Sequence, residues 1–157
     1  MAEIIAPEER LAALKLTLPN PPAPGGNYVS SKQCGSIVYL AGVISTNADG
    51  VIAGTAGGGR TIEEGYAAAR ACALTQLAVL RRDLGTLNRI EEVLTVNGYV
   101  NAVPGFADST AIINGASDLL VEVFGEAGRH VRAAVGVSAL PRNALVELQM
   151  TVRLKDS

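Results

Sequence analysis

Two long segments with helical start and stop signals alternate with runs of strand-forming residues, and this order limits the folds open to the chain. Thr61 and Glu64 have the spacing of a capping box, which predicts a helix to about Leu84, ended by Gly85. A second helix is expected from about Asp108 to Phe124. Because strands are predicted before, between and after these helices, we expect an α+β fold. It would have one mixed sheet of about six strands, with both long helices packed on one face.

The strand-forming runs fall into five segments. The first two read as a hairpin with a turn at Cys34 and Gly35, and the last two could pair around Pro141 to Asn143. The predicted strands are Tyr28 to Gln33, Ser36 to Val43, Ile90 to Val100, Arg132 to Ala139 and Ala144 to Leu154. A short helix is expected from Pro7 to Leu16, and the polar, glycine-rich stretch from Thr46 to Arg60 is expected to be a loop.

Composition favours one globular domain over residues 1–157, since 48% of the residues are apolar and 18% are charged. A net charge of −2 and an aromatic content of 4% argue against a nucleic-acid-binding surface. No apolar run reaches the ~18 residues of a membrane span, and the N-terminus lacks the pattern of a secretory signal. Cys34 and Cys72 lie in different predicted elements, so we expect two reduced, buried thiols in a cytoplasmic protein.

Two charges stand out in the apolar C-terminal region. Arg132 begins one predicted strand and Glu147 lies inside the next. A guanidinium can bind a carboxylate through two parallel hydrogen bonds, and a carboxylate nearby can act on a water molecule. If the two strands formed a hairpin, these side chains could lie on neighbouring rungs. The alternative is a structural ion pair or an outward-facing strand residue.

Other kinds of site receive little support from the residues. His130 is the single histidine, with no cysteine or carboxylate at ligand spacing, so no metal site is expected. A serine–histidine triad would have to use His130, and the sequence has no GxSxG motif. Gly57 to Thr61 precedes a helix but lacks both common phosphate-binding patterns, which favours a plain loop.

Several motifs together resemble the RidA/YjgF family, also known as endoribonuclease L-PSP, from about Pro24 to Leu154. They are Gly26 to Val29, Gly35 to Gly42, Arg132 followed by Leu140-Pro141, and Val146-Glu147. The resemblance implies a chorismate-mutase-like α+β subunit that assembles as a homotrimer, with sites in clefts between subunits. Residues 1–18 would be an additional N-terminal helix and lead-in.

The resemblance also implies a function. Members of the deaminase branch hydrolyse reactive 2-imino acids to 2-oxo acids and ammonia, without a metal or an organic cofactor. Arg132 would bind the substrate carboxylate, Glu147 would orient or activate the attacking water, and Tyr28 and Asn114 would line the substrate pocket.

The chain departs from that branch next to the arginine. Ala133 and Ala134 stand where the deaminases carry a small polar residue and a cysteine, and Gly136 replaces a residue that is often charged. These departures indicate a divergent subgroup. They keep two alternatives open: a non-catalytic ligand-binding or regulatory trimer, and, from the family label, a ribonuclease or translation inhibitor. No membrane partner is expected.

Overall fold

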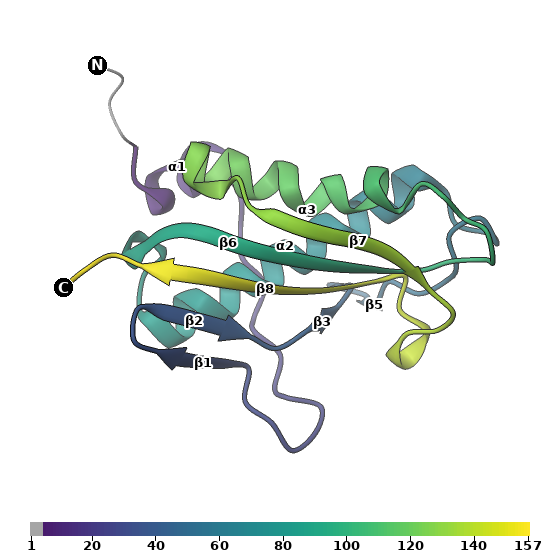
Figure 1. The fold of residues 1–157 in the computed structure, drawn as a ribbon, viewed down its shortest axis with the longest axis horizontal. Coiled ribbons are helices and arrows are strands. Elements are labelled where there is room, and N and C mark those ends of the chain that lie inside the picture. Colours follow the sequence, from purple (N-terminus) through teal and green to yellow (C-terminus); the bar gives the residue numbers. More distant parts are fainter. Residues whose placement is uncertain (1–4) are drawn as a thin grey trace.

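The computed structural model describes residues 5–157 and has one curved, mixed sheet with two long helices on one face (Figure 1). This is the expected α+β arrangement. The helices are α1 (Pro7–Ala13), α2 (Ile62–Leu84) and α3 (Ser109–Phe124). The strands are β1 (Ser31–Cys34), β2 (Ile37–Leu40), β3 (Val43–Ile44), β4 (Thr46–Asn47), β5 (Gly50–Val51), β6 (Ile90–Asn101), β7 (Val131–Val137) and β8 (Val146–Leu154).

The six-stranded sheet has the order β1-β2-β8-β6-β7, and β3 pairs with β8 beyond the end of β2. Strand β7 runs parallel to β6, which α3 makes possible by crossing between them, and the other pairs are antiparallel. The expected hairpin of the last two strands is therefore wrong, because β6 lies between β7 and β8. The Pro141–Asn143 segment forms a short 3₁₀ turn instead.

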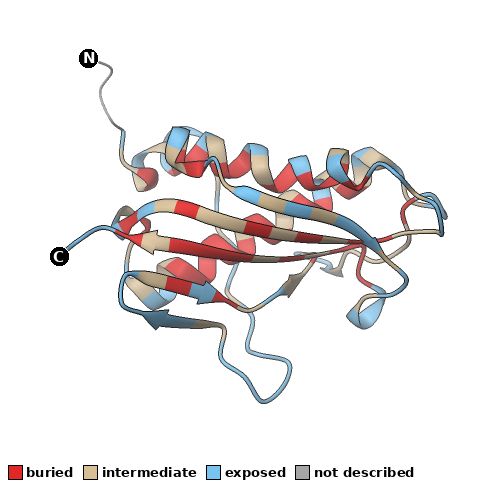
Figure 2. Cartoon of the chain, in the orientation of Figure 1, coloured by how far each residue is buried: buried red, intermediate tan, exposed pale blue. Residues whose placement is uncertain are grey.

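The core lies between the sheet and the two long helices, where buried residues line the facing surfaces in Figure 2. Helix α2 begins at the predicted capping box and ends at Gly85, which adopts the left-handed conformation. Helices α2 and α3 approach so closely at Gly115 that a Cβ there would overlap the carbonyl oxygen of Tyr66. The sheet is thus covered on one face only, and the open face carries exposed Tyr39, Val131 and Val135.

Three local expectations need correction. The β1–β2 turn is formed by Gly35 and Ser36, one residue later than predicted, and Gly35 has a φ of 60°. Cys34 is exposed at the end of edge strand β1, whereas Cys72 is buried as expected. Helix α1 ends at Ala13, because Lys15 has a φ of 56° and cannot continue it.

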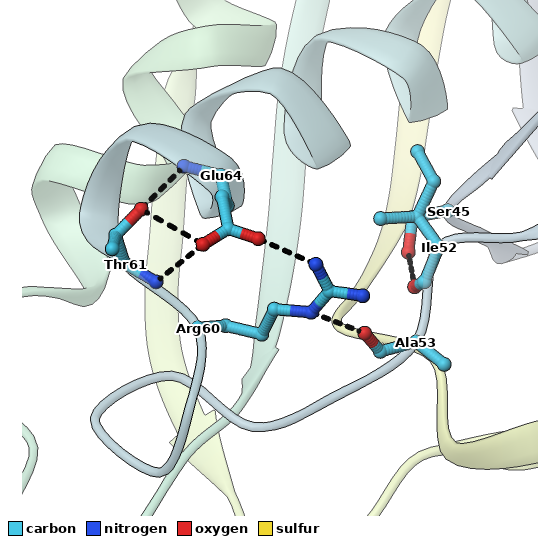
Figure 3. Close-up of polar contacts among 6 residues, drawn as sticks. All are labelled: Ser45, Ile52, Ala53, Arg60, Thr61 and Glu64. Carbon is cyan, nitrogen blue, oxygen red and sulfur yellow. Dashed lines mark hydrogen bonds and ion pairs between the residues drawn. The ribbon is translucent and has the colours of Figure 1, made fainter.

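The stretch from Thr46 to Arg60 is more ordered than a loop. It contains the β4–β5 hairpin, and its backbone bonds to Asn143 and Asn101 through Gly54 and Ala56. Figure 3 shows how Arg60 fastens the end of the stretch. Its Nε donates to the carbonyl of Ala53 at 2.8 Å, and its Nη1 pairs with Glu64 of the capping box. Asn101 and Asn143 are distant in sequence from this stretch, so its local composition did not reveal the order that they impose.

Candidate functional site

A cleft of about 500 Å³ opens at the junction of β2, β3 and β8, and it contains two of the predicted site residues, Tyr28 and Glu147. One wall is the extended segment that precedes β1, and another is the 3₁₀ turn that precedes β8. The lining residues are largely apolar or small, and among those described the charged ones are Glu147 and Arg142.

Glu147 reaches the cleft because of an irregularity in the sheet. Tyr39 pairs with Thr151 and Val43 pairs with Leu148, so three residues of one edge oppose two residues of β8. This bulge brings Gly42 against the glutamate, and a Cβ on Gly42 would lie 3.3 Å from the Glu147 carboxyl carbon. Bulges often redirect the chain beside functional sites, and here the glycine leaves room for the carboxylate.

Two glutamines satisfy the backbone groups that the bulge leaves unpaired. Gln76 of α2 donates to the carbonyls of Ala41 and Leu148 at 2.9 and 3.0 Å, and Gln149 donates to the carbonyl of Leu40 at 3.1 Å. The bulge is therefore held from both faces of the sheet. Sequence reasoning missed both residues, although a glutamine in the buried stripe of α2 was a usable signal.

Burial raises the pKa of the Glu147 carboxyl, and no interaction with residues 5–157 counteracts this effect. A partly buried carboxyl with a raised pKa inside a cleft is a candidate general acid or base, because it can hold or release a proton nearer to neutral pH. The chemistry that this cleft can support is proton transfer to or from a small bound molecule.

Cys72 lies behind the glutamate and is not a second reactive group. Its thiol is fully buried and contacts the carbonyl oxygens of Val43 and Val146 at 3.6 and 3.7 Å. Burial, followed by the charge of Glu147, raises the pKa of the thiol. A thiol kept protonated is a poor nucleophile, in line with the expected role as a core residue.

Arg132 lies elsewhere, on edge strand β7 beside α3. Its Nη1 donates to Ser117 Oγ at 2.9 Å and its Nη2 donates to the carbonyl of Thr110 at 3.1 Å. Asn114 is exposed and lies on the same face of α3, one turn from each of these two residues. The structure thus brings Arg132 and Asn114 together, but apart from Tyr28 and Glu147.

A histidine completes the surroundings of the arginine. His130 Nδ1 lies 2.7 Å from the carbonyl of Gly128, and its Nε2 lies 2.8 Å from Ser117 Oγ. The carbonyl can only accept, so Nδ1 carries the proton and the serine hydroxyl donates to Nε2. Burial lowers the pKa of His130, and the nearby Arg132 charge adds to this effect. Ser117 and the neutral histidine therefore hold one side of the guanidinium in place.

Sheet geometry explains why the two charged residues do not meet. Arg132 pairs across the sheet with Val96, which is buried against the helices, whereas Glu147 pairs with Tyr99. Because paired residues share a face and successive residues alternate, Arg132 and Glu147 point to opposite faces. The expectation that they could lie on neighbouring rungs is wrong, since β6 separates their strands.

Within residues 5–157, no three His, Cys, Asp or Glu side chains are close enough to hold a metal ion together. In the same part of the chain, no helix has the length and apolar character needed to cross a membrane.

Comparison with known proteins shows to which family this fold and these motifs belong. Residues 8–154 match the family described as "YjgF/chorismate mutase-like, putative endoribonuclease". The chain belongs to the RidA/YjgF family. Protein TCP17 of Trypanosoma cruzi is 42% identical to this chain over 148 residues, which cover 93% of this chain and 92% of that protein. That match is consistent with a divergent RidA/YjgF subgroup.

Two solved structures agree closely with this RidA/YjgF chain. Atu1372 of Agrobacterium tumefaciens, a protein of unknown function, has a TM-score of 0.86 and 37% identity, covering 96% of this chain and 94% of its own. A Shewanella oneidensis MR-1 protein described as "a putative endoribonuclease" has a TM-score of 0.90 and 35% identity, covering 96% of this chain and 100% of its own. The similarity thus extends over nearly the whole RidA/YjgF domain.

Proposed function

We propose that this protein binds small carboxylate metabolites in a cleft completed by a second copy of the chain, and hydrolyses 2-imino acids to 2-oxo acids and ammonia. The single observation that carries the proposal is the Glu147 carboxyl, whose pKa burial raises, beside Tyr28 in a cleft of about 500 Å³. A cleft of this size suits a small metabolite.

The reaction needs positioning and proton transfer more than it needs an external cofactor. Water adds to the electrophilic C=N carbon, the imine nitrogen takes up a proton, and the resulting carbinolamine expels ammonia to leave a C=O group. In this scheme Glu147 accepts a proton from the attacking water and returns it to the departing nitrogen. Tyr28 also lines the cleft, and its hydroxyl accepts a hydrogen bond from the Gly25 amide at 3.1 Å.

Arg132 enters the proposal through a neighbouring copy. Its strand, β7, is an edge strand of the sheet, and Val131 and Val135 on the open sheet face are 71% and 45% exposed. Exposed apolar side chains on an uncovered sheet face support burial against another subunit. In a homotrimer, Arg132 and Asn114 of one copy would bind the substrate carboxylate beside Glu147 of the next. The assembly would work in the cytoplasm.

The test is hydrolysis of 2-iminopropanoate, generated in situ and followed against its spontaneous decay. Glu147→Gln and Arg132→Ala should each reduce the enzymatic rate by at least about a hundredfold, within the usual range for loss of a general acid–base group. Arg82→Ala is the matched control, since Arg82 is exposed and pairs with its neighbour Asp83. A Glu147→Gln protein that hydrolyses the imine at the wild-type rate would refute the assignment.

A non-catalytic binding protein is the second candidate, and one observation favours it. Among the described residues that line the cleft, Glu147 is the single group suited to proton transfer near neutral pH. Ala133 and Ala134 add none beside the arginine. Ligand binding without any imine turnover by pure protein would favour this candidate. The support for ribonuclease activity is confined to the descriptions given to the family and to one related structure, and the net charge of −2 argues against it.

A further inference from the structure

Arg142 is the second charged residue of the cleft, and the proposed reaction gives it no role. It lies in the 3₁₀ turn between β7 and β8 and lines the same cleft as Glu147. It is exposed, and it takes part in none of the ion pairs or side-chain hydrogen bonds formed among residues 5–157. A guanidinium without a protein partner at the mouth of a small cleft is available to an anionic ligand.

The backbone at this turn is fixed in an uncommon conformation. Arg142 and Asn143 have φ values of 55° and 57°, in the left-handed region that non-glycine residues rarely adopt. Asparagine adopts this left-handed region more readily than most residues, whereas arginine has no such preference. Glycine would adopt it without strain, so local folding does not explain an arginine at this position.

Several hydrogen bonds hold the turn in place. The Asn143 amide donates to the carbonyl of Leu140 at 3.1 Å, and the Gly54 amide donates to the carbonyl of Asn143 at 2.9 Å. Buried Asn101 donates from Nδ2 to Asn143 Oδ1 at 3.2 Å and to the carbonyl of Ala144 at 3.1 Å. Arg142 therefore projects from a rigid turn, which lowers the entropy lost when its side chain binds a ligand.

We propose that Arg142 binds a second carboxylate of the ligand, so that the cleft selects 2-imino and 2-oxo dicarboxylic acids over their monocarboxylic counterparts. This inference rests on the proposed function, in which Arg132 of a neighbouring copy binds the carboxylate next to the reacting carbon. The more distant carboxylate then needs a cation of its own, because Glu147 would otherwise repel it. The reaction is unchanged: a 2-imino dicarboxylate and water give a 2-oxo dicarboxylate and ammonia.

The test compares two stable product analogues, 2-oxoglutarate and 2-oxobutanoate, by calorimetric titration of the full-length protein. Wild type should bind 2-oxoglutarate about tenfold more tightly, as expected for one additional charged hydrogen-bonding pair. Arg142→Asn removes the charge with a residue that tolerates the left-handed region, and it should abolish that preference. It should leave 2-oxobutanoate binding within about twofold, the limit for a residue that does not touch this ligand.

Two further variants keep the result interpretable. Arg142→Lys keeps the charge and should retain part of the preference, and the preference should shrink at high salt. Arg129→Asn is the control, because Arg129 is an exposed arginine paired with Glu126 at the other end of β7. It should bind both acids like wild type.

The outcomes separate this inference from the proposed function. If wild type binds both acids equally well, or if Arg142→Asn weakens both acids equally, the second-carboxylate role is wrong and carboxylate binding stands. If wild type binds neither acid and hydrolyses no imine, the proposed function fails as well. Thermal unfolding of Arg142→Asn should match or exceed that of wild type, since the strained arginine is gone.

Discussion

The close approach of α2 and α3 gives the sharpest prediction about stability. Gly115 of α3 faces the backbone of α2, and a Cβ built on it would come far closer to the Tyr66 carbonyl oxygen than the 3.0 Å that real Cβ atoms keep. A carbonyl that belongs to a helix cannot rotate aside as a side chain can. Gly115→Ala therefore forces the two helices apart, and the whole interface between them is affected.

The size of the effect follows from three contributions. A separation of roughly 1 Å forfeits a quarter to a half of the attraction between facing atoms, and overpacking of this kind costs about 1–3 kcal/mol or more. Alanine returns about 1 kcal/mol through its higher helix propensity. Because the clash is with backbone, we expect the upper part of the range and a net loss of about 2 kcal/mol. For a chain of this size that corresponds to a fall in Tm of about 4–8 °C.

Gly65→Ala is the matched comparison, measured by urea unfolding and by thermal unfolding. Gly65 lies on α2, and a Cβ there would meet side-chain atoms of Ile112 at 2.7 Å. Ile112 can shift, and the gain in helix propensity offsets much of the strain, so we expect a change within about 1 kcal/mol. If Gly115→Ala proves as stable as wild type, or more stable than Gly65→Ala, the reasoning from backbone contact is wrong.

Three further variants test the site and its support. Burial raises the pKa of Glu147 in the folded state. As the pH rises, the unfolded chain therefore loses the Glu147 proton at a lower pH than the folded protein does. The free energy of unfolding then falls as the pH rises above the unfolded pKa of about 4.3. Glu147→Gln should therefore raise the urea midpoint at pH 7, and this gain should vanish below about pH 4. Thr61→Ala removes the capping box and should lower the free energy of unfolding by about 1 kcal/mol, measured by urea denaturation. Gly42→Ala should displace the Glu147 carboxylate by a few tenths of an ångström, and slow imine hydrolysis by about tenfold with little change in Tm.

The long helices could be predicted because their signals are local. The Thr61–Glu64 capping box and the left-handed Gly85 act within one turn of the residues that they affect, and both are present as expected. The fold class followed from the order of elements, and the RidA/YjgF motifs placed it in a family. The chain from Thr46 to Arg60 was misjudged because its order comes from tertiary partners such as Asn101 and Asn143.

The pairing of the strands in the sheet could not be predicted from the sequence. Two apolar strands separated by a short turn resemble a hairpin, yet α3 leads into β7 alongside β6, and β8 then enters on the other side of β6. The residues of the turn between β7 and β8 do not show whether the two strands pair with each other or with β6. The relative positions of Arg132 and Glu147 therefore could not be predicted from the sequence. Arg142 was overlooked because its place in the cleft depends on how the turn before β8 packs against residues that are distant in sequence.

The separation of Arg132 and Glu147 on opposite faces of the sheet makes the subunit arrangement testable. If a site uses Arg132 of one copy and Glu147 of the next, neither Arg132→Ala nor Glu147→Gln alone forms a complete site. Co-refolding the two variants in equal amounts should create mixed oligomers. In roughly a quarter of the sites between adjacent copies, one copy would then supply native Arg132 and the other native Glu147.

Imine hydrolysis should then return to roughly a quarter of the wild-type rate, since each complete site acts on its own. Refolding each variant separately before mixing is the control, and it should yield no recovery. Activity that stays absent in the co-refolded sample, while the mixed oligomers are shown to form, would mean that no site joins these residues from two copies. The carboxylate next to the reacting carbon would then have to bind to Arg142 of the same chain, which is the cation that already lines the cleft beside Glu147.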